Sequence, residues 1–95
     1  MWKVEIHPLV FKEDFPKIDR SAQARIIKTI HKKLAIAPIE YGKPLAGDLK
    51  GYWRLRVDDY RVIYRVAKER VHVFVIKVGI RRDDEVYRQF SVRLK

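Results

Sequence analysis

The chain opens with residues that alternate between apolar and polar, and the alternation marks its predicted strands. Residues 2–7 have this period of two and stop at Pro8, which predicts a first strand. The same pattern returns at residues 52–57 and 60–66, on either side of Asp58 and Asp59, and predicts a hairpin with a two-residue loop. Residues 71–78 are apolar at nearly every position, as expected for a strand covered on both faces.

Helical spacing fills the stretches between and after these strands. Val10 to Ile18 predicts a short helix that breaks or ends near Pro16. A second helix begins after Asp19 or Ser21, has its apolar face at Ile26, Ile27, Ile30 and Leu34, and ends by Pro38. Residues 38–51 predict a loop, and residues 83–94 predict a last helix with Val86, Phe90 and Leu94 on one face.

Together these elements predict one α+β domain that spans residues 1–95. The order is an N-terminal strand, two helices, a three-stranded antiparallel meander and a C-terminal helix. The apolar side of the hairpin, with Trp53, Leu55, Val57, Tyr60, Val62 and Tyr64, is expected to face the core.

Charge and composition narrow the classes of partner. The 95 residues carry 22 Lys and Arg against 12 Asp and Glu, a formal net charge of +10, so a polyanion is the first partner to consider. There is no cysteine, which excludes disulfides and thiolate chemistry. The longest apolar run is far shorter than the ~20 residues of a membrane span, so we expect a cytoplasmic protein with no membrane partner.

The polar side of the hairpin is the strongest candidate site. It carries Tyr52, Arg54 and Arg56 on one strand and Arg61, Ile63 and Arg65 on the other, and the two-residue loop places Arg56 opposite Arg61. Like charges directly opposite are destabilising, so an anion is the expected ligand. Alternatively, this is simply the solvated face of a basic protein.

Other candidate residues lie near this face or fit it chemically. Arg81 and Arg82 follow the last strand and extend the same basic field, and Lys43 and Lys50 in the loop are candidate phosphate contacts. Tyr87 is either a base-stacking ring or an aromatic at the edge of the core. The histidines His7, His31 and His72 fit no metal spacing, so we expect neither a metal site nor a cofactor.

Several segments resemble the RelE/ParE toxin superfamily, whose size, order of elements and basic sheet face match essentially the whole chain. They are KPLAGDLKGYWRLR at residues 43–56, YRVIY at 60–64, VGIR at 78–81 and EVY at 85–87. For the RelE branch, the resemblance implies an mRNA endonuclease that acts in the ribosomal A site, next to ribosomal RNA. It also implies a cognate antitoxin, through which alone the toxin would meet operator DNA.

The resemblance also implies roles for single residues. Arg61, Arg81 and Tyr87 match positions used at the scissile phosphate, and Arg54 matches a position that is commonly basic. The RNA 2′-hydroxyl would attack the phosphate without a metal, and Tyr52, Arg56, Arg65, Arg82, Lys43 and Lys50 would bind RNA. Tyr52 and Ile80 replace basic residues of the pattern, which leaves the proton transfer unassigned. A gyrase poison of the ParE branch and a non-catalytic basic RNA-binding module remain the alternatives.

Overall fold

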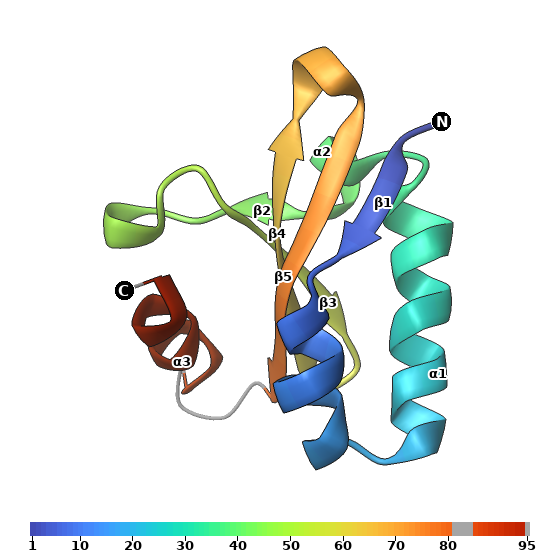
Figure 1. The fold of residues 1–95 in the computed structure, drawn as a ribbon. Coiled ribbons are helices and arrows are strands. Elements are labelled where there is room, and N and C mark those ends of the chain that lie inside the picture. Colours follow the sequence, from blue (N-terminus) through green and yellow to red (C-terminus); the bar gives the residue numbers. More distant parts are fainter. Residues whose placement is uncertain (81–84, 95) are drawn as a thin grey trace.

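The computed structural model describes residues 1–80 and 85–94, and its centre is a five-stranded sheet (Figure 1). The strands are β1 (Lys3–Ile6), β2 (Lys43–Pro44), β3 (Trp53–Val57), β4 (Tyr60–Ala67) and β5 (His72–Ile80). Their order is β1-β5-β4-β3-β2, with β1 parallel to β5 and the other pairs antiparallel. The predicted α+β class and meander are confirmed, and the short β2 is an addition to them.

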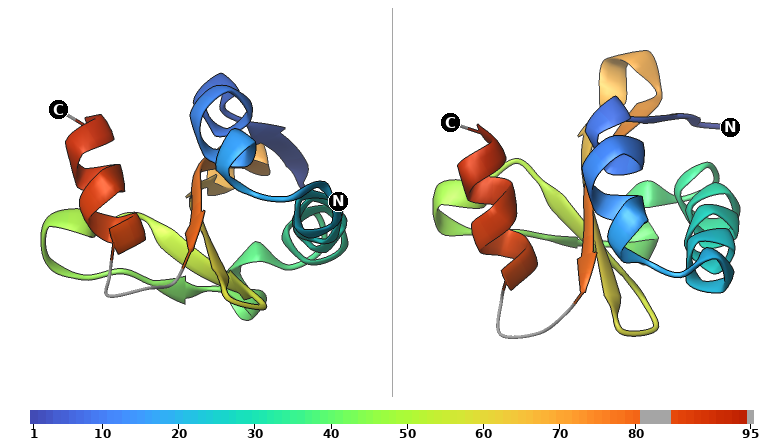
Figure 2. Two further views of the ribbon diagram at one scale, coloured as in Figure 1. Left: turned by 90° about the horizontal axis from the view of Figure 1, so that it is seen from below. Right: turned by 60° about the horizontal axis from the view of Figure 1, so that its bottom comes forward.

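Helices cover both faces of this sheet. The helical turns η1 (Val10–Asp14) and η2 (Phe15–Lys17) lead to α1 (Arg20–Thr29), which continues as the wider turn η3 (Ile30–Leu34). The predicted loop contains three short elements, α2 (Pro38–Tyr41), β2 and η4 (Gly47–Leu49), and η5 (Lys68–Arg70) joins β4 to β5. The last helix, α3 (Glu85–Leu94), lies on the opposite side of the sheet from α1 (Figures 1 and 2). Within residues 1–80 and 85–94, no helix is long and apolar enough to cross a bilayer.

Local chemistry explains where α1 begins and which face it buries. The Asp19 carboxylate accepts the backbone N–H of Ala22 at 2.7 Å, which satisfies a donor that the first helical turn leaves free. Ile26, Ile30 and Leu34 are fully buried, as their helical spacing predicted. Pro16 stands at the start of η2, where its missing N–H does not break a helical hydrogen bond.

The two faces of the sheet have separate hydrophobic clusters. The larger cluster joins η1, α1 and η3 to inward residues of the meander, including Leu55, Val62 and Tyr64. The smaller cluster consists of Ile63, Val86 and Phe90, with Leu45, Leu49, Tyr52, Ile76 and Tyr87 around it. The helix α3 approaches β5 closely, because a Cβ atom added at Gly79 would lie 2.7 Å from the Cγ2 of Val86.

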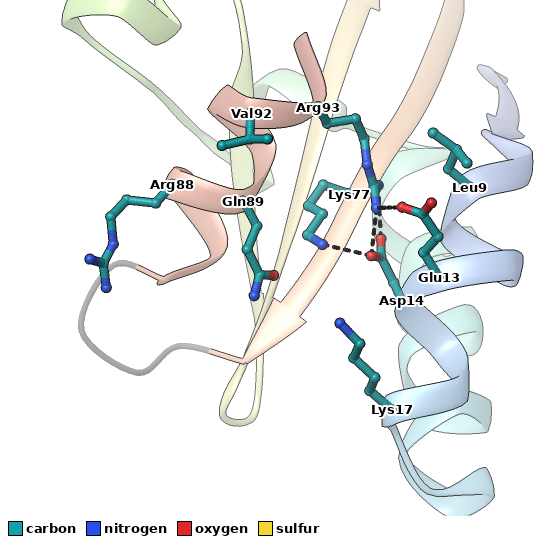
Figure 3. Close-up of a pocket in the computed structure, with 9 residues that line it drawn as sticks. All are labelled: Leu9, Glu13, Asp14, Lys17, Lys77, Arg88, Gln89, Val92 and Arg93. Carbon is teal, nitrogen blue, oxygen red and sulfur yellow. Dashed lines mark hydrogen bonds and ion pairs between the residues drawn. The ribbon is translucent and has the colours of Figure 1, made fainter. Parts of the chain in front are cut away.

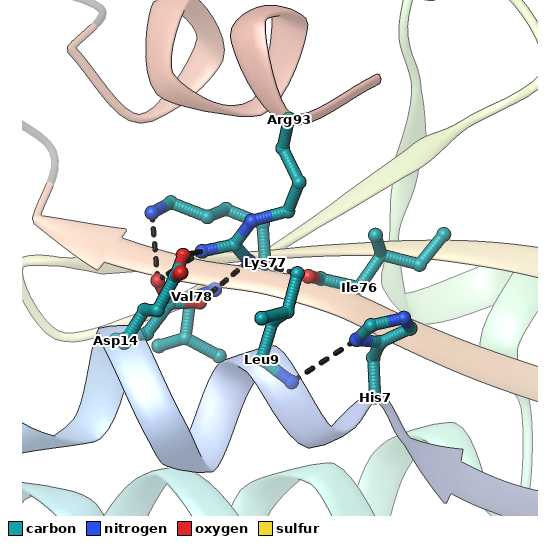
Figure 4. A network of polar contacts seen from close by, with 8 residues as sticks. His7, Leu9, Asp14, Ile76, Lys77, Val78 and Arg93 are labelled. Atoms are coloured by element: carbon teal, nitrogen blue, oxygen red, sulfur yellow. Dashed lines mark hydrogen bonds and ion pairs between the residues drawn. The ribbon is translucent and has the colours of Figure 1, made fainter. Parts of the chain in front are cut away.

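The buried carboxylate of Asp14 connects η1 to β5 and α3 (Figure 4). It accepts the Lys77 ammonium at 2.7 Å, the backbone N–H of Val78 at 2.9 Å and two Arg93 nitrogens at 2.9 and 3.1 Å. Arg93 also donates to the carbonyl of Ile76 at 2.9 Å and to Glu13 at 3.0 Å. We call this set the Asp14 network.

The Asp14 network stabilises charges that burial alone would disfavour. Desolvation would lower the pKa of the Arg93 guanidinium, but its hydrogen bonds and charge attraction to Asp14, and then to Glu13, raise that pKa above its ordinary value. Val78 lies in β5 beyond the end of the short β1, so the carboxylate also satisfies an N–H that β1 does not reach.

The hairpin has the predicted register. Val57 pairs with Tyr60, and Arg56 pairs directly with Arg61. Asp58 begins the two-residue loop with a φ of 52°, a left-handed conformation that aspartate tolerates better than most residues.

The Asp14→Ala substitution tests the network. It leaves the buried Lys77 ammonium without its carboxylate, so we expect the free energy of unfolding to fall by about 3–5 kcal/mol. Urea denaturation measures this loss. The control is Asp19→Ala, which removes a helix cap and should cost about 1 kcal/mol. A loss for Asp14→Ala no greater than for this control would contradict the assigned role.

The Arg56→Ala substitution tests the repulsion across the hairpin. Because Arg56 is exposed and lies opposite Arg61, we expect stability to be unchanged or to rise by a few tenths of a kcal/mol, about 0.2–0.5. The matched control is Arg25→Ala, which breaks an ion pair with Asp58 of 3.0 Å and should lose about 0.2–1 kcal/mol. A loss above about 1 kcal/mol for Arg56→Ala would show that this arginine has a stabilising partner.

Candidate functional site

The four arginines of the hairpin lie on one side of β3 and β4, as the alternation predicted, but α3 covers the middle of that side. Ile63 is fully buried in the cluster with Val86 and Phe90 of α3. Of the arginines around it, Arg56 and Arg65 are exposed, Arg54 is half-buried and Arg61 is only 8% exposed. The face is therefore divided by a helix instead of being open along its length.

Arg61 lies where α3 approaches β5. Its cross-strand partner on β5 is Gly79, and Gly79 lies directly beneath Val86. The charge of Arg61 is thus kept in a partly desolvated place, where its interaction with an anion is stronger than in bulk water.

Tyr87 is on the same side of the sheet as Arg54 and Arg61. Its half-buried side chain packs against the cluster formed by Ile63, Val86 and Phe90. Ile63 pairs with Arg54 across the hairpin and is two residues from Arg61 along β4. The structure therefore places Arg54 and Arg61 beside the buried Ile63, and Tyr87 against the cluster to which Ile63 belongs.

Two of the predicted RNA-binding residues have other contacts. The ring of Tyr52 meets that of Phe90 edge to face, with centroids 4.8 Å apart, so Tyr52 helps to hold α3. Arg65 lies on the other side of Ile63 from Arg61, and its guanidinium is 5.2 Å from the centroid of the Phe74 ring.

The remaining predicted residues fall into two groups. Lys43 is exposed and pairs with Arg54 across β2 and β3, whereas Lys50 is exposed after η4, away from the paired part of β2 and β3. Arg81 and Arg82 lie outside the described residues.

A groove of about 640 Å³ separates η1 and η2 from α3 (Figure 3). Its walls include Glu13, Asp14, Lys17, Lys77 and Arg93. Asp14 and Glu13 are engaged by Lys77 and Arg93, so the charges at the base of the groove compensate one another. We interpret this groove as the seam that attaches α3 and not as the site of chemistry.

Sequence reasoning missed the Asp14 network. The available signal was Lys77, a cation within an otherwise apolar strand, which requires a buried acidic partner. The pattern alone could not identify that partner, because Asp14 is 63 residues from Lys77 and 79 from Arg93.

Two of the three histidines, His7 and His72, have structural contacts. The Nδ1 atom of His7 accepts the N–H of Leu9 at 3.1 Å, and His72 stacks on Phe74 with centroids 4.1 Å apart. In the ranges 1–80 and 85–94, no three His, Asp or Glu side chains are grouped so that they could hold a metal ion.

Tyr64 is a further phenol of the hairpin, but it belongs to the core. It donates a hydrogen bond of 2.6 Å to the carbonyl of Pro38, and burial raises the pKa of its hydroxyl above the usual range for tyrosine. The Tyr64 hydroxyl therefore keeps its proton. The groups of the basic face that could act on a substrate are the guanidinium groups of its arginines and the side chain of Tyr87.

Comparison with known proteins identifies the family. The profile of the family described as the ParE toxin of the type II toxin-antitoxin system, parDE, matches residues 4–85. The chain is 34% identical over 91 residues to the mRNA interferase toxin RelE of Escherichia coli K12, covering 90% of this chain and 95% of RelE. It is 30% identical over 78 residues to toxin RelG of Mycobacterium tuberculosis, covering 82% of this chain and 87% of RelG.

Solved structures agree on the fold. The toxin-antitoxin complex RelBE2 of Mycobacterium tuberculosis contains a chain with a TM-score of 0.78 and 26% identity, covering 84% of this chain and 98% of that one. The isolated Escherichia coli RelE toxin gives a TM-score of 0.68 at 24% identity, with both chains fully covered. The chain thus belongs to the RelE/ParE superfamily and is a toxin of the type II toxin-antitoxin class.

Proposed function

We propose that this toxin is an mRNA interferase that cuts messages in the ribosomal A site without a metal and thereby inhibits translation. The observation that carries the proposal is that Arg54 and Arg61 flank Ile63 on one side of the sheet, while Tyr87 of α3 packs against the cluster that contains Ile63. The relative named as an mRNA interferase, RelE of Escherichia coli, supports the same reaction class.

The proposed reaction uses the RNA as its own nucleophile. The 2′-oxygen forms a bond to the adjacent phosphorus while the bond to the 5′-oxygen breaks, which yields a 2′,3′-cyclic phosphate and a 5′-hydroxyl. Arg61 and Arg54, with Arg81 beyond the described residues, would stabilise the charge that develops on the phosphoryl oxygens. Tyr87 would orient the nucleotide, by stacking or through its hydroxyl.

Two protons must move in this reaction. One leaves the 2′-hydroxyl and one reaches the departing 5′-oxygen. Arginine keeps its charge at physiological pH, so Arg54 and Arg61 are poorly suited to either transfer. The transfers therefore fall to a phenol, that of Tyr52 or Tyr87, or to the ribosome.

We propose a cognate antitoxin as the regulatory partner. The similar structures include toxins solved with antitoxins, among them RelBE2 of Mycobacterium tuberculosis and the Escherichia coli RelBE complex. A net charge of +10 favours a partner with acidic residues, which we expect to bind through an apolar stripe as well. We place this pair in the cytoplasm, where the toxin would meet operator DNA only through the antitoxin.

Co-expression tests the antitoxin. The neighbouring open reading frame should restore growth to cells that make this toxin, and the two chains should purify together. Normal growth of cells with demonstrated soluble toxin alone would contradict a toxin that needs an antitoxin.

A second candidate function is inhibition of DNA gyrase, which the ParE description of the matching family favours. The two functions separate in two assays on the purified chain. A gyrase poison inhibits supercoiling and leaves ribosome-bound messages intact, whereas an mRNA interferase does the reverse.

Substitutions on the face test the proposed chemistry. Arg61→Ala should slow cleavage of ribosome-bound mRNA by roughly a hundredfold, mainly in kcat, because its contact to the phosphoryl oxygens strengthens as charge develops in the transition state. Tyr87→Ala should also slow cleavage by roughly a hundredfold, because the nucleotide is no longer held in the orientation for attack. Arg54→Lys should retain activity, since lysine keeps the charge and can also donate a proton. Tyr87→Phe should stay active if the ring only stacks and lose activity if its hydroxyl is needed.

Primer extension on a translated message, with a chelator present, measures this cleavage. Arg20→Ala, an exposed arginine at the start of α1, is the control that should cut normally. Thermal unfolding of each variant separates a lost contact from a lost fold, because Arg61 is buried. Full activity of Arg61→Ala would remove that arginine from the mechanism.

A further inference from the structure

A basic pocket lies at the edge of the sheet, beside β3. Its volume is about 230 Å³, and it is lined by Lys33, Tyr41, Lys43, Arg54, Leu55 and Arg56. We call it the edge pocket. Lys33 and Tyr41 come from η3 and α2, on the side of α1, whereas the other residues belong to β2 and β3. The edge pocket therefore joins the helical layer to the side of β3 and β4 that carries Arg54 and Arg61, which we call the candidate cleavage face. Arg54 belongs to both sites.

The charges of the edge pocket are uncompensated among the described residues. Four of its six residues are cationic and none is acidic. None of the four cations forms an ion pair with any residue in the ranges 1–80 and 85–94. Lys43 even lies directly opposite Arg54, an arrangement that destabilises a sheet unless an anion lies between the two charges.

Two further contacts indicate what kind of anion fits. The Nε atom of Arg54 is shielded from solvent and has no hydrogen-bond acceptor within the described part of the chain. Tyr41 is 52% exposed, and the Lys33 ammonium lies 5.4 Å from the centroid of its ring. Guanidinium and ammonium donors beside an exposed aromatic ring suit a phosphate with a base attached.

We propose that the edge pocket binds a phosphodiester of single-stranded RNA, with a neighbouring base stacked on Tyr41. The proposal rests on the proposed function and extends it, because Arg54 lies between the edge pocket and the face of Arg61. One RNA strand would pass from the cleavage face over the edge of β3, with Lys33 and Tyr41 binding a nucleotide that is not cut. These two residues bind substrate and take no part in bond cleavage.

The test uses the whole chain and a labelled single-stranded RNA oligonucleotide. Lys33→Ala and Tyr41→Ala should each weaken RNA binding by about tenfold, because one charged contact or one stacked base is lost. Tyr41→Phe should bind as the wild type does, since phenylalanine keeps the ring. Lys32→Ala is the matched control, because Lys32 is an exposed neighbour in η3 that does not line the edge pocket and should leave binding unchanged.

Assays on ribosomes determine whether the bound phosphate belongs to the message or to ribosomal RNA. Lys33→Ala and Tyr41→Ala should raise KM for message cleavage by about tenfold with little change in kcat. If they also weaken binding to ribosomes without a message, the phosphate comes from ribosomal RNA, and if only programmed ribosomes are affected, it comes from the message. Either result supports an RNA phosphodiester in the edge pocket.

The outcomes keep this proposal apart from the proposed function. Weaker oligonucleotide binding by both variants of a chain that cuts no message would support the edge pocket and contradict the nuclease. Unchanged oligonucleotide affinity in both variants would overturn the edge pocket, whether or not messages are cut. Binding of a glutamate-rich peptide that depends on Lys33, with RNA affinity unaffected, would also overturn it and assign the edge pocket to an acidic protein segment.

Discussion

The carboxylate of Asp14 is the interaction on which the arrangement of this toxin depends. It is buried at the point where η1, β5 and α3 meet, and it serves Lys77, Arg93 and the backbone of Val78 at once. Without it, β5 would have an unpaired donor beyond β1, and α3 would lose the ion pair by which Arg93 attaches it to η1. Because α3 covers Ile63 and carries Tyr87, the same carboxylate fixes the geometry of the candidate cleavage face.

On the basic side of the sheet, cations lie next to other cations instead of next to carboxylates. Where α3 attaches, positive charges are matched by Asp14 and Glu13. On β3 and β4, Arg56 and Arg61 are instead cross-strand neighbours of the same charge. Lys43 and Arg54 repeat this repulsion at the next strand pair. Repulsion between cations at two successive strand pairs destabilises the sheet. An RNA phosphate bound beside these cations would relieve the repulsion. The proposed function supplies such a ligand, since messages and ribosomal RNA both carry phosphates.

The sequence predicted those parts of the structure that depend on local pattern. The two-residue loop at Asp58 and Asp59 fixes the register, so the pairing of Arg56 with Arg61 could be predicted from the sequence alone. The buried positions Ile26, Val86 and Phe90 followed in the same way from helical spacing. Contacts between distant segments were not predictable, because no local pattern reveals them. They include the burial of Arg61, the packing of Tyr52 on Phe90, and the meeting of Lys33 and Tyr41 with β3 in the edge pocket.

The central claim is that the uncompensated cations of β2, β3 and η3 bind RNA phosphates. Its most direct test is the affinity of the wild-type chain for programmed ribosomes as the salt concentration rises from roughly 50 to 200 mM. Four phosphate contacts, at Lys33, Lys43, Arg54 and Arg56, predict that the logarithm of the affinity falls with the logarithm of salt at a slope of roughly −3 or steeper, about −0.7 for each contact. An affinity that stays constant over this range would contradict the account.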